Sequence, residues 1–228
     1  MMNKERVVIV GIGETAELAT DYFLHDSEYE ICAYAAQKAY IDEKLPERVI
    51  DGYPVVEVES LTELYPPTQY KLFVAMAYGK MNYDRRNMYL TLKKEGYKFV
   101  SYISSHAYVG SNVSIGENCF ILENNVIQRN VSIGDNVILW SGNHIGHRTK
   151  IHDHVFLSSH VAVSGLCEIG ENCFLGINCT LGDHISVAEN CFIGGGVVLM
   201  HDTKPGELYR VPPVKPDRLG TKLVFGYK

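Results

Sequence analysis

The chain has 228 residues, of which 46% are hydrophobic and 21% charged, and its formal net charge is −6. This composition suffices for one or two domains with apolar cores and excludes a disordered chain or a small disulfide scaffold. A negative surface argues against nucleic-acid binding, which needs clustered Lys and Arg. No apolar run approaches the roughly 18–20 residues of a membrane span, and the first residues lack the pattern of a secretory signal. We therefore expect a cytoplasmic protein that binds neither nucleic acid nor membranes.

The N-terminal part of the chain alternates apolar and helical segments. Apolar runs that predict strands lie at 6–10, 29–36, 71–76 and near 98–103. The segments that suit helices end at His25 and span about 82–95. Because strands alternate with helices, residues 1–105 are expected to form a small parallel α/β domain of the Rossmann-like kind.

A Gly-rich turn follows the first strand. Gly11 and Gly13 match the loose G-x-G-x-x-[GA] fingerprint of dinucleotide-binding folds, between a strand and a helix. The second strand, however, ends in Ala36-Gln37 where an NAD site usually places an acidic residue. We therefore expect Gly11, Gly13 and Glu14 to hold a phosphate or to admit a substrate close to the backbone. A turn that only packs is the alternative.

A six-residue repeat occupies the C-terminal half. Every sixth residue from Val109 to Leu199 is Val, Ile or Leu, at sixteen positions without interruption. The residue two positions earlier is mostly small or β-branched, so both side chains lie on one face of a strand. Gly follows the repeated position in eight of sixteen hexapeptides, and Asn stands three residues after it in eight. Both types tolerate left-handed backbone, so each hexapeptide predicts a short strand and a tight corner of a parallel β-helix.

The same pattern accounts for the cysteines. The small inward position holds five of the six: Cys119, Cys167, Cys173, Cys179 and Cys191. Cysteine at such a position acts as a small buried hydrophobe. No C-x-x-C pair supports a disulfide or a zinc site, and we expect no bound metal.

Residues 107–204 resemble the left-handed β-helix of hexapeptide-repeat acyltransferases, in which three hexapeptides form one coil of eighteen residues. Together with the preceding α/β domain, the order resembles sugar acetyltransferases related to sialic acid O-acetyltransferase and to the bacillosamine-pathway N-acetyltransferases. The resemblance implies a nucleotide-sugar-binding domain (1–105) and a left-handed β-helix acetyltransferase domain (106–204). The C-terminal residues 205–228 are Pro-rich, so we expect an extended tail over the helix surface. The resemblance also implies a homotrimer that uses acetyl-CoA.

The resemblance also implies contacts to a nucleotide-linked amino sugar. Residues 73–86 look like the family's strand-loop-helix at the sugar-nucleotide pocket, which suggests Tyr78, Asn82 and Arg85 as substrate contacts. Residues 35–43 depart from the family's more usual Asp-rich loop, so the nucleobase contact stays open.

The outward corner residues change character in the middle of the repeat. Asn fills the first five of these corner positions, but Gly142, Arg148, His154, His160 and Leu166 fill the next five. The same stretch holds five of the nine histidines: His144, His147, His152, His154 and His160. Three explanations remain open: solvated corner residues, zinc binding between subunits as in the γ-carbonic anhydrases, or a general base.

The resemblance favours a general base and places it at His147. An amine or hydroxyl that attacks a thioester must lose a proton, and an imidazole can accept it for a gain of about 10²–10⁴. Relatives often follow this histidine with a Glu that orients the ring, whereas here Arg148 follows. The orienting acceptor is then expected to be Asp153 or a backbone carbonyl, with His144 as a further supporting residue.

The same alignment implies contacts to acetyl-CoA. Gly165 matches a glycine whose amide meets the thioester carbonyl, which would stabilise the developing oxyanion. Ile177 and Gly195 match backbone contacts to the pantetheine arm, for which simple corner geometry is the alternative. Lys204 is expected to meet a CoA phosphate.

The expected activity is direct, acetyl-CoA-dependent N-acetylation of a nucleotide-linked amino sugar. O-acetylation of a sugar hydroxyl, as in sialic acid, is the first alternative. A zinc lyase of the γ-carbonic anhydrase kind and a non-catalytic binding module are the others.

Overall fold

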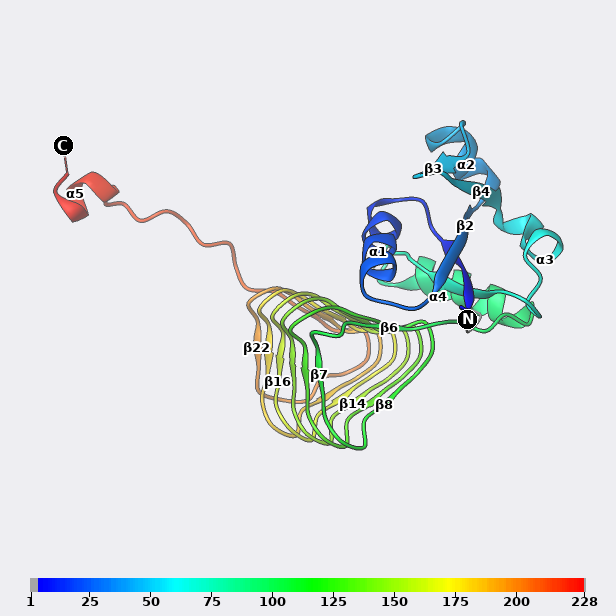
Figure 1. Cartoon of the computed structure of the whole chain (residues 1–228). Coiled ribbons are helices and arrows are strands. Elements are labelled where there is room, and N and C mark those ends of the chain that lie inside the picture. Colours follow the sequence, from blue (N-terminus) through cyan, green and yellow to red (C-terminus); the bar gives the residue numbers. More distant parts are fainter. Residues whose placement is uncertain (1–3, 228) are drawn as a thin grey trace.

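The computed structural model describes residues 4–227, which form an α/β domain, a triangular β-helix and a C-terminal tail (Figure 1). The α/β domain has a sheet in the order β3-β4-β2-β1-β5, in which β4, β2, β1 and β5 are parallel and β3 is antiparallel to β4. Its strands are β1 (Arg6–Val10), β2 (Glu30–Ala36), β3 (Val49–Ile50), β4 (Tyr53–Glu57) and β5 (Lys71–Val74). The predicted parallel α/β domain is thereby confirmed.

Helices cover both faces of this sheet. The helical elements are α1 (Glu14–His25), α2 (Lys38–Lys44), the short 3-10 helix η1 (Val58–Ser60), α3 (Leu61–Leu64) and α4 (Tyr83–Lys94). Helix α1 packs Ala19 and Phe23 against one face, in a core shared with the β-helix. Helix α4 packs Tyr89 and Leu92 against the other face. Both long helices fall where the sequence predicts them.

The β-helix has three flat faces. The six-stranded face contains β7 (Tyr108–Val109), β10 (Val126–Ile127), β13 (His144–Ile145), β16 (Ala162–Val163), β19 (Thr180–Leu181) and β22 (Val198–Leu199). The five-stranded face contains β8 (Ser114–Ile115), β11 (Ser132–Ile133), β14 (Lys150–Ile151), β17 (Glu168–Ile169) and β20 (Ser186–Val187). The seven-stranded face contains β6 (Tyr102–Ile103), β9 (Phe120–Ile121), β12 (Ile138–Leu139), β15 (Phe156–Leu157), β18 (Phe174–Leu175), β21 (Phe192–Ile193) and β23 (Leu208–Tyr209).

Residues eighteen apart lie above one another in this helix. Val126 pairs with His144, and Ile127 with Ile145, in a parallel register that repeats from coil to coil. The repeated Val, Ile and Leu positions and the five inward cysteines form one continuous buried core, with the first coil less completely covered. The predicted left-handed parallel β-helix is therefore confirmed.

The corners have the backbone that the sequence predicts. Fifteen consecutive corner positions, from Asn112 to Gly196, have φ between 54° and 79°. The ten other residues with positive φ between positions 4 and 227 lie outside this series, so the corner residues alone turn the chain at each vertex of the β-helix. Arg148, Leu166 and the corner histidines adopt the same conformation as the asparagines, so some other role selects these side chains.

One face of the β-helix is apolar on the outside. The outward residues of the seven-stranded face are Tyr102, Phe120, Ile138, Phe156, Phe174 and Phe192. The rings of Phe156 and Phe174 stack with their centroids 5.3 Å apart, and those of Phe174 and Phe192 4.8 Å apart. The α/β domain packs on this ladder and shares its core, so the two domains bury one another's apolar surface.

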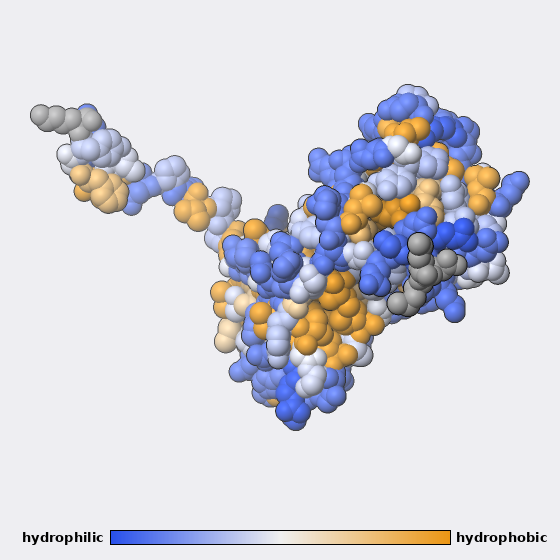
Figure 2. Space-filling model, viewed as in Figure 1, coloured by the Kyte–Doolittle hydropathy of each residue, from blue (hydrophilic) through white to orange (hydrophobic). Residues whose placement is uncertain are grey.

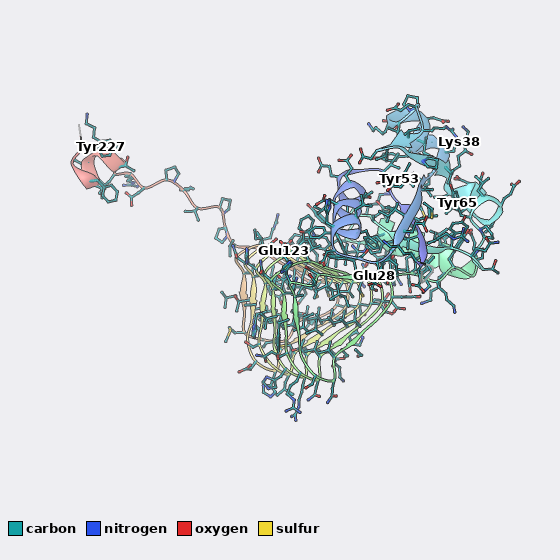
Figure 3. The ribbon with its side chains drawn as sticks, viewed as in Figure 1. Glu28, Lys38, Tyr53, Tyr65, Glu123 and Tyr227 are labelled. Atoms are coloured by element: carbon teal, nitrogen blue, oxygen red, sulfur yellow. The ribbon has the colours of Figure 1, made fainter. Side chains whose placement is uncertain are left out.

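The ladder of strands extends beyond the repeat at both ends. Strand β6 begins at Tyr102, and β23 pairs with β21 as far as Tyr209. After Tyr209 the described residues are exposed and project away from the β-helix, so the tail does not follow the helix surface as expected (Figure 1). The tail ends in helix α5 (Thr221–Phe225), and Tyr227 lies far from both domains (Figure 3).

A ladder of polar side chains at one corner predicts a pH-dependent stability. His154 is buried, and its Nδ1 lies 2.9 Å from Nδ2 of Asn136. Burial is the largest cause that lowers the pKa of His154, from its usual 6.5 to about 4. The nearby carboxylate of Asp153 raises this pKa, and the nearby Arg85 and Arg86 lower it. The unfolded chain therefore binds more protons between these values, and stability falls as the pH drops from about 6.5 to about 4, by about 3 kcal/mol in full.

The matched variant is His154→Asn, because Asn occupies the same corner at four other coils and tolerates a φ of 64°. Urea unfolding at pH 7 and pH 4.5 should show a smaller acid destabilisation in His154→Asn than in the wild type. Equal losses in both proteins would show that His154 does not carry this dependence.

Candidate functional site

His147 lies at the corner between the six-stranded and five-stranded faces, which we call the His147 corner (146–148 and the equivalent residues of the other coils). The side chain is exposed and projects from a left-handed turn that continues with Arg148 at a φ of 59°. The coil before contributes Gln128 and Arg129, and the coil after contributes Gly165. This corner therefore assembles its side chains from three successive coils.

Gln128 holds the imidazole of His147. Its Oε1 accepts the backbone N–H of His147 at 2.8 Å and lies 3.3 Å from Nδ1 of the same residue. Within the amide group of Gln128 only the oxygen can accept a hydrogen bond, so the atom next to Nδ1 is an acceptor. The second contact therefore requires a proton on Nδ1. The neutral ring then presents an unprotonated Nε2, the atom that a general base needs.

Sequence reasoning missed Gln128 as the orienting residue. The available signal was its position directly after Ile127, where Gly is the commonest residue of the repeat. Asp153, the expected acceptor, lies instead at the corner under α4, and its Oδ1 accepts the N–H of Asp135 at 2.8 Å. A two-residue strand separates Asp153 from the corner of His147. The expectation that Asp153 orients the ring is therefore corrected, because Gln128 does so instead.

The histidines of this stretch do not form one patch. His144 is exposed on β13, two residues before the His147 corner turns. The corner that faces α4 (152–154 and the equivalent residues, the α4 corner) holds His152 and His154. His160 lies at the third corner, next to Gly142. The expected concentration of histidines is thus distributed over all three corners.

Gly165 lies directly against the imidazole of His147. A Cβ at this position would stand 2.6 Å from Cε1, 2.9 Å from Nδ1 and 3.0 Å from Nε2 of that ring. The amide of Gly165 is already used, because it donates to Oδ1 of Asp183 at 3.1 Å. The expected role of this amide as an oxyanion donor is therefore corrected: within this chain, Gly165 provides space for the base.

The other residues expected to contact acetyl-CoA lie at different corners. Ile177, which is 53% exposed, and Gly195 stack at the third corner, where a Cβ on Gly195 would stand 3.1 Å from Cγ2 of Ile177. Within residues 4–227, neither of these two amides has a hydrogen-bond partner. Lys204 follows the last full coil, and its backbone N–H donates to Oε2 of Glu207 at 2.9 Å. The chain thus offers two free backbone donors at one corner.

The Gly-rich turn lies at the carboxyl ends of the parallel strands. Gly11 has a φ of 137° and donates its N–H to the carbonyl of Ala35 at 2.8 Å, and a Cβ there would stand 2.5 Å from the carbonyl oxygen of Ala75. Gly13 precedes α1, and Glu14 is exposed in its first turn. Packing therefore requires a glycine at position 11, whereas Gly13 and Glu14 remain accessible.

Tyr78 lies on a strained loop above the apolar ladder. Three successive residues of this loop, Lys80 to Asn82, have φ between 47° and 66°, and each such non-glycine residue costs about 1 kcal/mol or more. The ring of Tyr78 lies 5.1 Å from that of Phe156 and 4.9 Å from that of Phe174, yet the residue stays 52% exposed. Tyr78 is therefore available to a ligand.

Asn82 and Arg85 are buried and join the two domains instead. Arg85 donates from Nε to Oδ1 of Asn136 at 3.1 Å and from Nη2 to the carbonyl of His154 at 2.9 Å. Asn82 donates to the carbonyl of Cys173 at 3.1 Å. Burial lowers the pKa of Arg85 to about 9. Because both side chains are fully buried and bonded within the protein, the expected substrate contacts by Asn82 and Arg85 are wrong.

The α/β domain of the same chain does not reach His147. Its hydrogen bonds to the β-helix, within residues 4–227, end on the seven-stranded face and on the two corners that flank it, at Glu123 on one side and at Asn136 and Glu171 on the other. Figure 3 shows Glu123 at the corner beneath α1. The His147 corner is the remaining vertex, and Figure 2 shows hydrophilic residues over it. The Gly-rich turn and His147 of one chain are therefore not brought together.

Comparison with known proteins supports this architecture. The sequence profile of the GMPPB C-terminal domain matches residues 101–205, which are the β-helix. No curated protein sequence matches the chain. No helix within residues 4–227 is both long and apolar enough to cross a bilayer.

Solved structures match both domains at once. The acetyltransferase domain of PglB from Neisseria gonorrhoeae, solved with acetyl coenzyme A, has a TM-score of 0.79 and 20% identity, covering 94% of this chain and 100% of its own. PerB from Caulobacter crescentus, solved with CoA and GDP-perosamine, has a TM-score of 0.78 and 22% identity, covering 91% of this chain and 94% of its own. WeeI from Acinetobacter baumannii has a TM-score of 0.55 and 16% identity, covering 86% and 96%. The chain therefore shares the fold of these proteins, an α/β domain followed by a left-handed β-helix, over nearly its whole length.

Proposed function

We propose that the protein is an acetyl-CoA-dependent N-acetyltransferase of a nucleotide-linked amino sugar, with His147 as general base. The observation that carries the proposal is the exposed imidazole of His147, oriented by Gln128 and left free at Nε2. The shared fold supports it, because the PglB domain was solved with acetyl coenzyme A and PerB with CoA and GDP-perosamine. All six cysteines are free, which suits a cytoplasmic location.

The reaction is direct transfer. The amine nitrogen attacks the thioester carbonyl, the new N–C bond forms, and the C–S bond breaks with CoA leaving as the thiol. Nε2 of His147 takes the proton that the amine loses, while the N–H at Nδ1 keeps donating to Oε1 of Gln128. No Ser or Cys nucleophile is required. The stiff β-helix holds the base at a fixed position, as an effective general base needs.

The acetyl-CoA contacts that we propose lie on the β-helix, which has backbone N–H groups without a partner within residues 4–227. The backbone N–H groups of Ile177 and Gly195 are suited to donate hydrogen bonds to carbonyl oxygens of the pantetheine arm. The absence of a side chain at Gly165 lets the imidazole of His147 lie against the backbone, and we place the thioester next to that ring. Lys204 is exposed, and we assign it to a phosphate of the coenzyme.

The active site needs more than one copy of the chain. Because the α/β domain covers the face opposite the His147 corner, the substrate-binding turn with Gly11, Gly13 and Glu14 has to come from a neighbouring copy. We propose a homotrimer. Light scattering of the purified protein measures the assembly directly, and a monomer that turns over at full rate would contradict the shared site.

The variant Gly165→Ala tests the space beside the base. Its Cβ would meet three imidazole atoms at 2.6–3.0 Å, so the ring has to move. A displacement of about 1 Å can lower the rate about 10²-fold, so we expect a fall of that size in kcat. The matched control is Gly182→Ala at the same corner of the next coil, where the Cβ meets only the exposed side chain of Met200 at 3.0 Å. Equal rates in the two variants would contradict the proposed packing.

The activity itself is tested by thiol release from acetyl-CoA. The wild type is offered amino sugars linked to UDP, GDP and dTDP, with the corresponding hydroxy sugars as comparison. Turnover with an amino sugar and a hydroxylamine-resistant product indicate an amide and support N-acetylation. A hydroxylamine-labile ester would indicate O-acetylation, and no thiol release with any acceptor would contradict the proposed function.

A further inference from the structure

Two arginines flank the base at the His147 corner. A pocket of about 300 Å³ is lined by Arg129, Asn130, His147 and Arg148. Arg129 comes from the coil before His147, and Arg148 follows it directly in the chain. The backbone N–H of Arg148 donates to the carbonyl of Arg129 at 3.2 Å, which fixes the two residues at adjacent levels of the same corner. Both arginines therefore line the same pocket as His147.

Neither arginine is neutralised by its own chain. Among residues 4–227, no Asp or Glu oxygen lies within 4.0 Å of either guanidinium group, although the protein carries a net charge of −6. The carboxylates of the neighbouring coils are used elsewhere: Asp183 accepts the amide of Gly165, and Asp153 accepts the amide of Asp135. Two adjacent cations without a counter-charge thus stand at the candidate base in an otherwise acidic protein.

These charges act on the chemistry of the site. When His147 takes a proton from the attacking amine, three positively charged side chains line the same pocket. An anionic group on the bound substrate would be attracted to such a pocket. Arginine is also the side chain best suited to hold phosphate or carboxylate oxygens, because it offers paired N–H donors in a planar fork.

The order of the stack indicates which substrate carries the anion. Arg129, His147 and Gly165 follow one another at intervals of eighteen residues, so Arg129 and Gly165 lie on opposite sides of His147 along the stack, and Arg148 lies in the same coil as His147. The proposed thioester occupies the glycine side. We propose that Arg129 and Arg148 bind an anionic group of the acceptor, a phosphate or a carboxylate within about one sugar ring of the acetylated nitrogen. This inference rests on the proposed function and names the charge that its acceptor must carry.

The test uses the full-length protein and the double variant Arg129→Gln/Arg148→Gln. Its matched control is Arg218→Gln, an exposed arginine of the tail outside both domains. The amino sugars are offered as nucleoside diphosphates, as 1-phosphates, as amino uronic acid methyl glycosides and as uncharged methyl glycosides. We expect KM in the double variant to rise about 10- to 100-fold for the acceptors that carry the recognised anion, as is typical for the loss of charge-assisted hydrogen bonds. KM for the uncharged glycoside and for acetyl-CoA should stay unchanged.

Each source of the anion gives its own result. A rise confined to the 1-phosphates and nucleoside diphosphates identifies a phosphate, and a rise confined to the uronic acids identifies a carboxylate. An equal rise for the uncharged glycoside would overturn the proposal, as would no rise for any acceptor. A rise in KM for acetyl-CoA alone would assign the arginines to the coenzyme and would also overturn it.

A binding measurement separates this inference from the proposed function. Inorganic pyrophosphate and glucuronate are titrated into the wild type, the double variant and the control by calorimetry, with no turnover required. If no acceptor releases thiol but the wild type binds one of these anions at least tenfold more tightly than the double variant, the anion site stands and the proposed activity fails. If thiol is released but all three proteins bind both anions equally, the activity stands and the anion site fails.

Discussion

Replacing His147 with alanine is expected to lower kcat about 10²–10⁴-fold, with a much smaller change in KM for acetyl-CoA. The imidazole removes the proton from the attacking amine, and a positioned general base contributes a factor of this size. Gln128 holds the ring through Nδ1, so the variant removes Nε2, the ring nitrogen that has no hydrogen bond within residues 4–227. Initial rates of thiol release, measured at saturating acetyl-CoA, test this directly.

The matched control is His144→Ala. His144 is exposed on β13 only three residues earlier, and no hydrogen bond holds its side chain within residues 4–227. The resemblance suggests a supporting role for His144, but no hydrogen bond joins its side chain to His147 within the described residues, so we expect this variant to keep a rate close to that of the wild type. Near-full activity in His147→Ala, or an equal loss in both variants, would show that another group accepts the proton.

The second large effect is expected from Arg85→Met, which should lower the free energy of unfolding by about 3 kcal/mol. The guanidinium group is fully buried and donates to Asn136 and to the carbonyl of His154. Methionine fills similar space but leaves the backbone carbonyls of Asn136 and His154, which both accept from Nη2, without that donor, and each buried unsatisfied group costs about 1–3 kcal/mol. Urea unfolding, followed by tyrosine fluorescence and circular dichroism, measures the loss.

Arg86→Met is the control for this change. Arg86 lies next in the chain but pairs with Glu171 at 2.9 Å near the surface, where ion pairs contribute about 0–1 kcal/mol. The control should therefore unfold within about 1 kcal/mol of the wild type. If both variants lose the same stability, Arg85 is not the residue that ties α4 to the β-helix.

The contrast between Arg85 and Arg148 shows why sequence reasoning succeeded for some site residues and not for others. Arg85 lies in a segment that resembles a sugar-nucleotide pocket, yet the structure buries it between α4 and the α4 corner. Nothing in the local sequence distinguishes an arginine that meets a ligand from one that meets backbone carbonyls of another domain. That distinction depends on which face of the β-helix the α/β domain covers.

The orienting partner of His147 shows the same limit at shorter range. The repeat of eighteen residues places Arg129 directly beneath His147, and a search by that register alone passes over Gln128. The side chain of Gln128 reaches across by one residue to contact both the backbone and the ring of His147. Asp153 is closer in sequence, but an intervening strand carries it to another corner.

The sequence by itself determined the β-helix. Inward Val, Ile and Leu at every sixth position and Asn or Gly at the corners dictate the fold locally, because a hexapeptide contacts mainly its equivalents one coil away. The apolar outward residues from Tyr102 to Phe192 also recur every eighteen residues, although their role as a docking surface emerges only with the α/β domain in place. The tertiary structure alone decided which polar side chains are buried between the domains and which remain at the free corner, because contacts between distant segments follow no period of the chain.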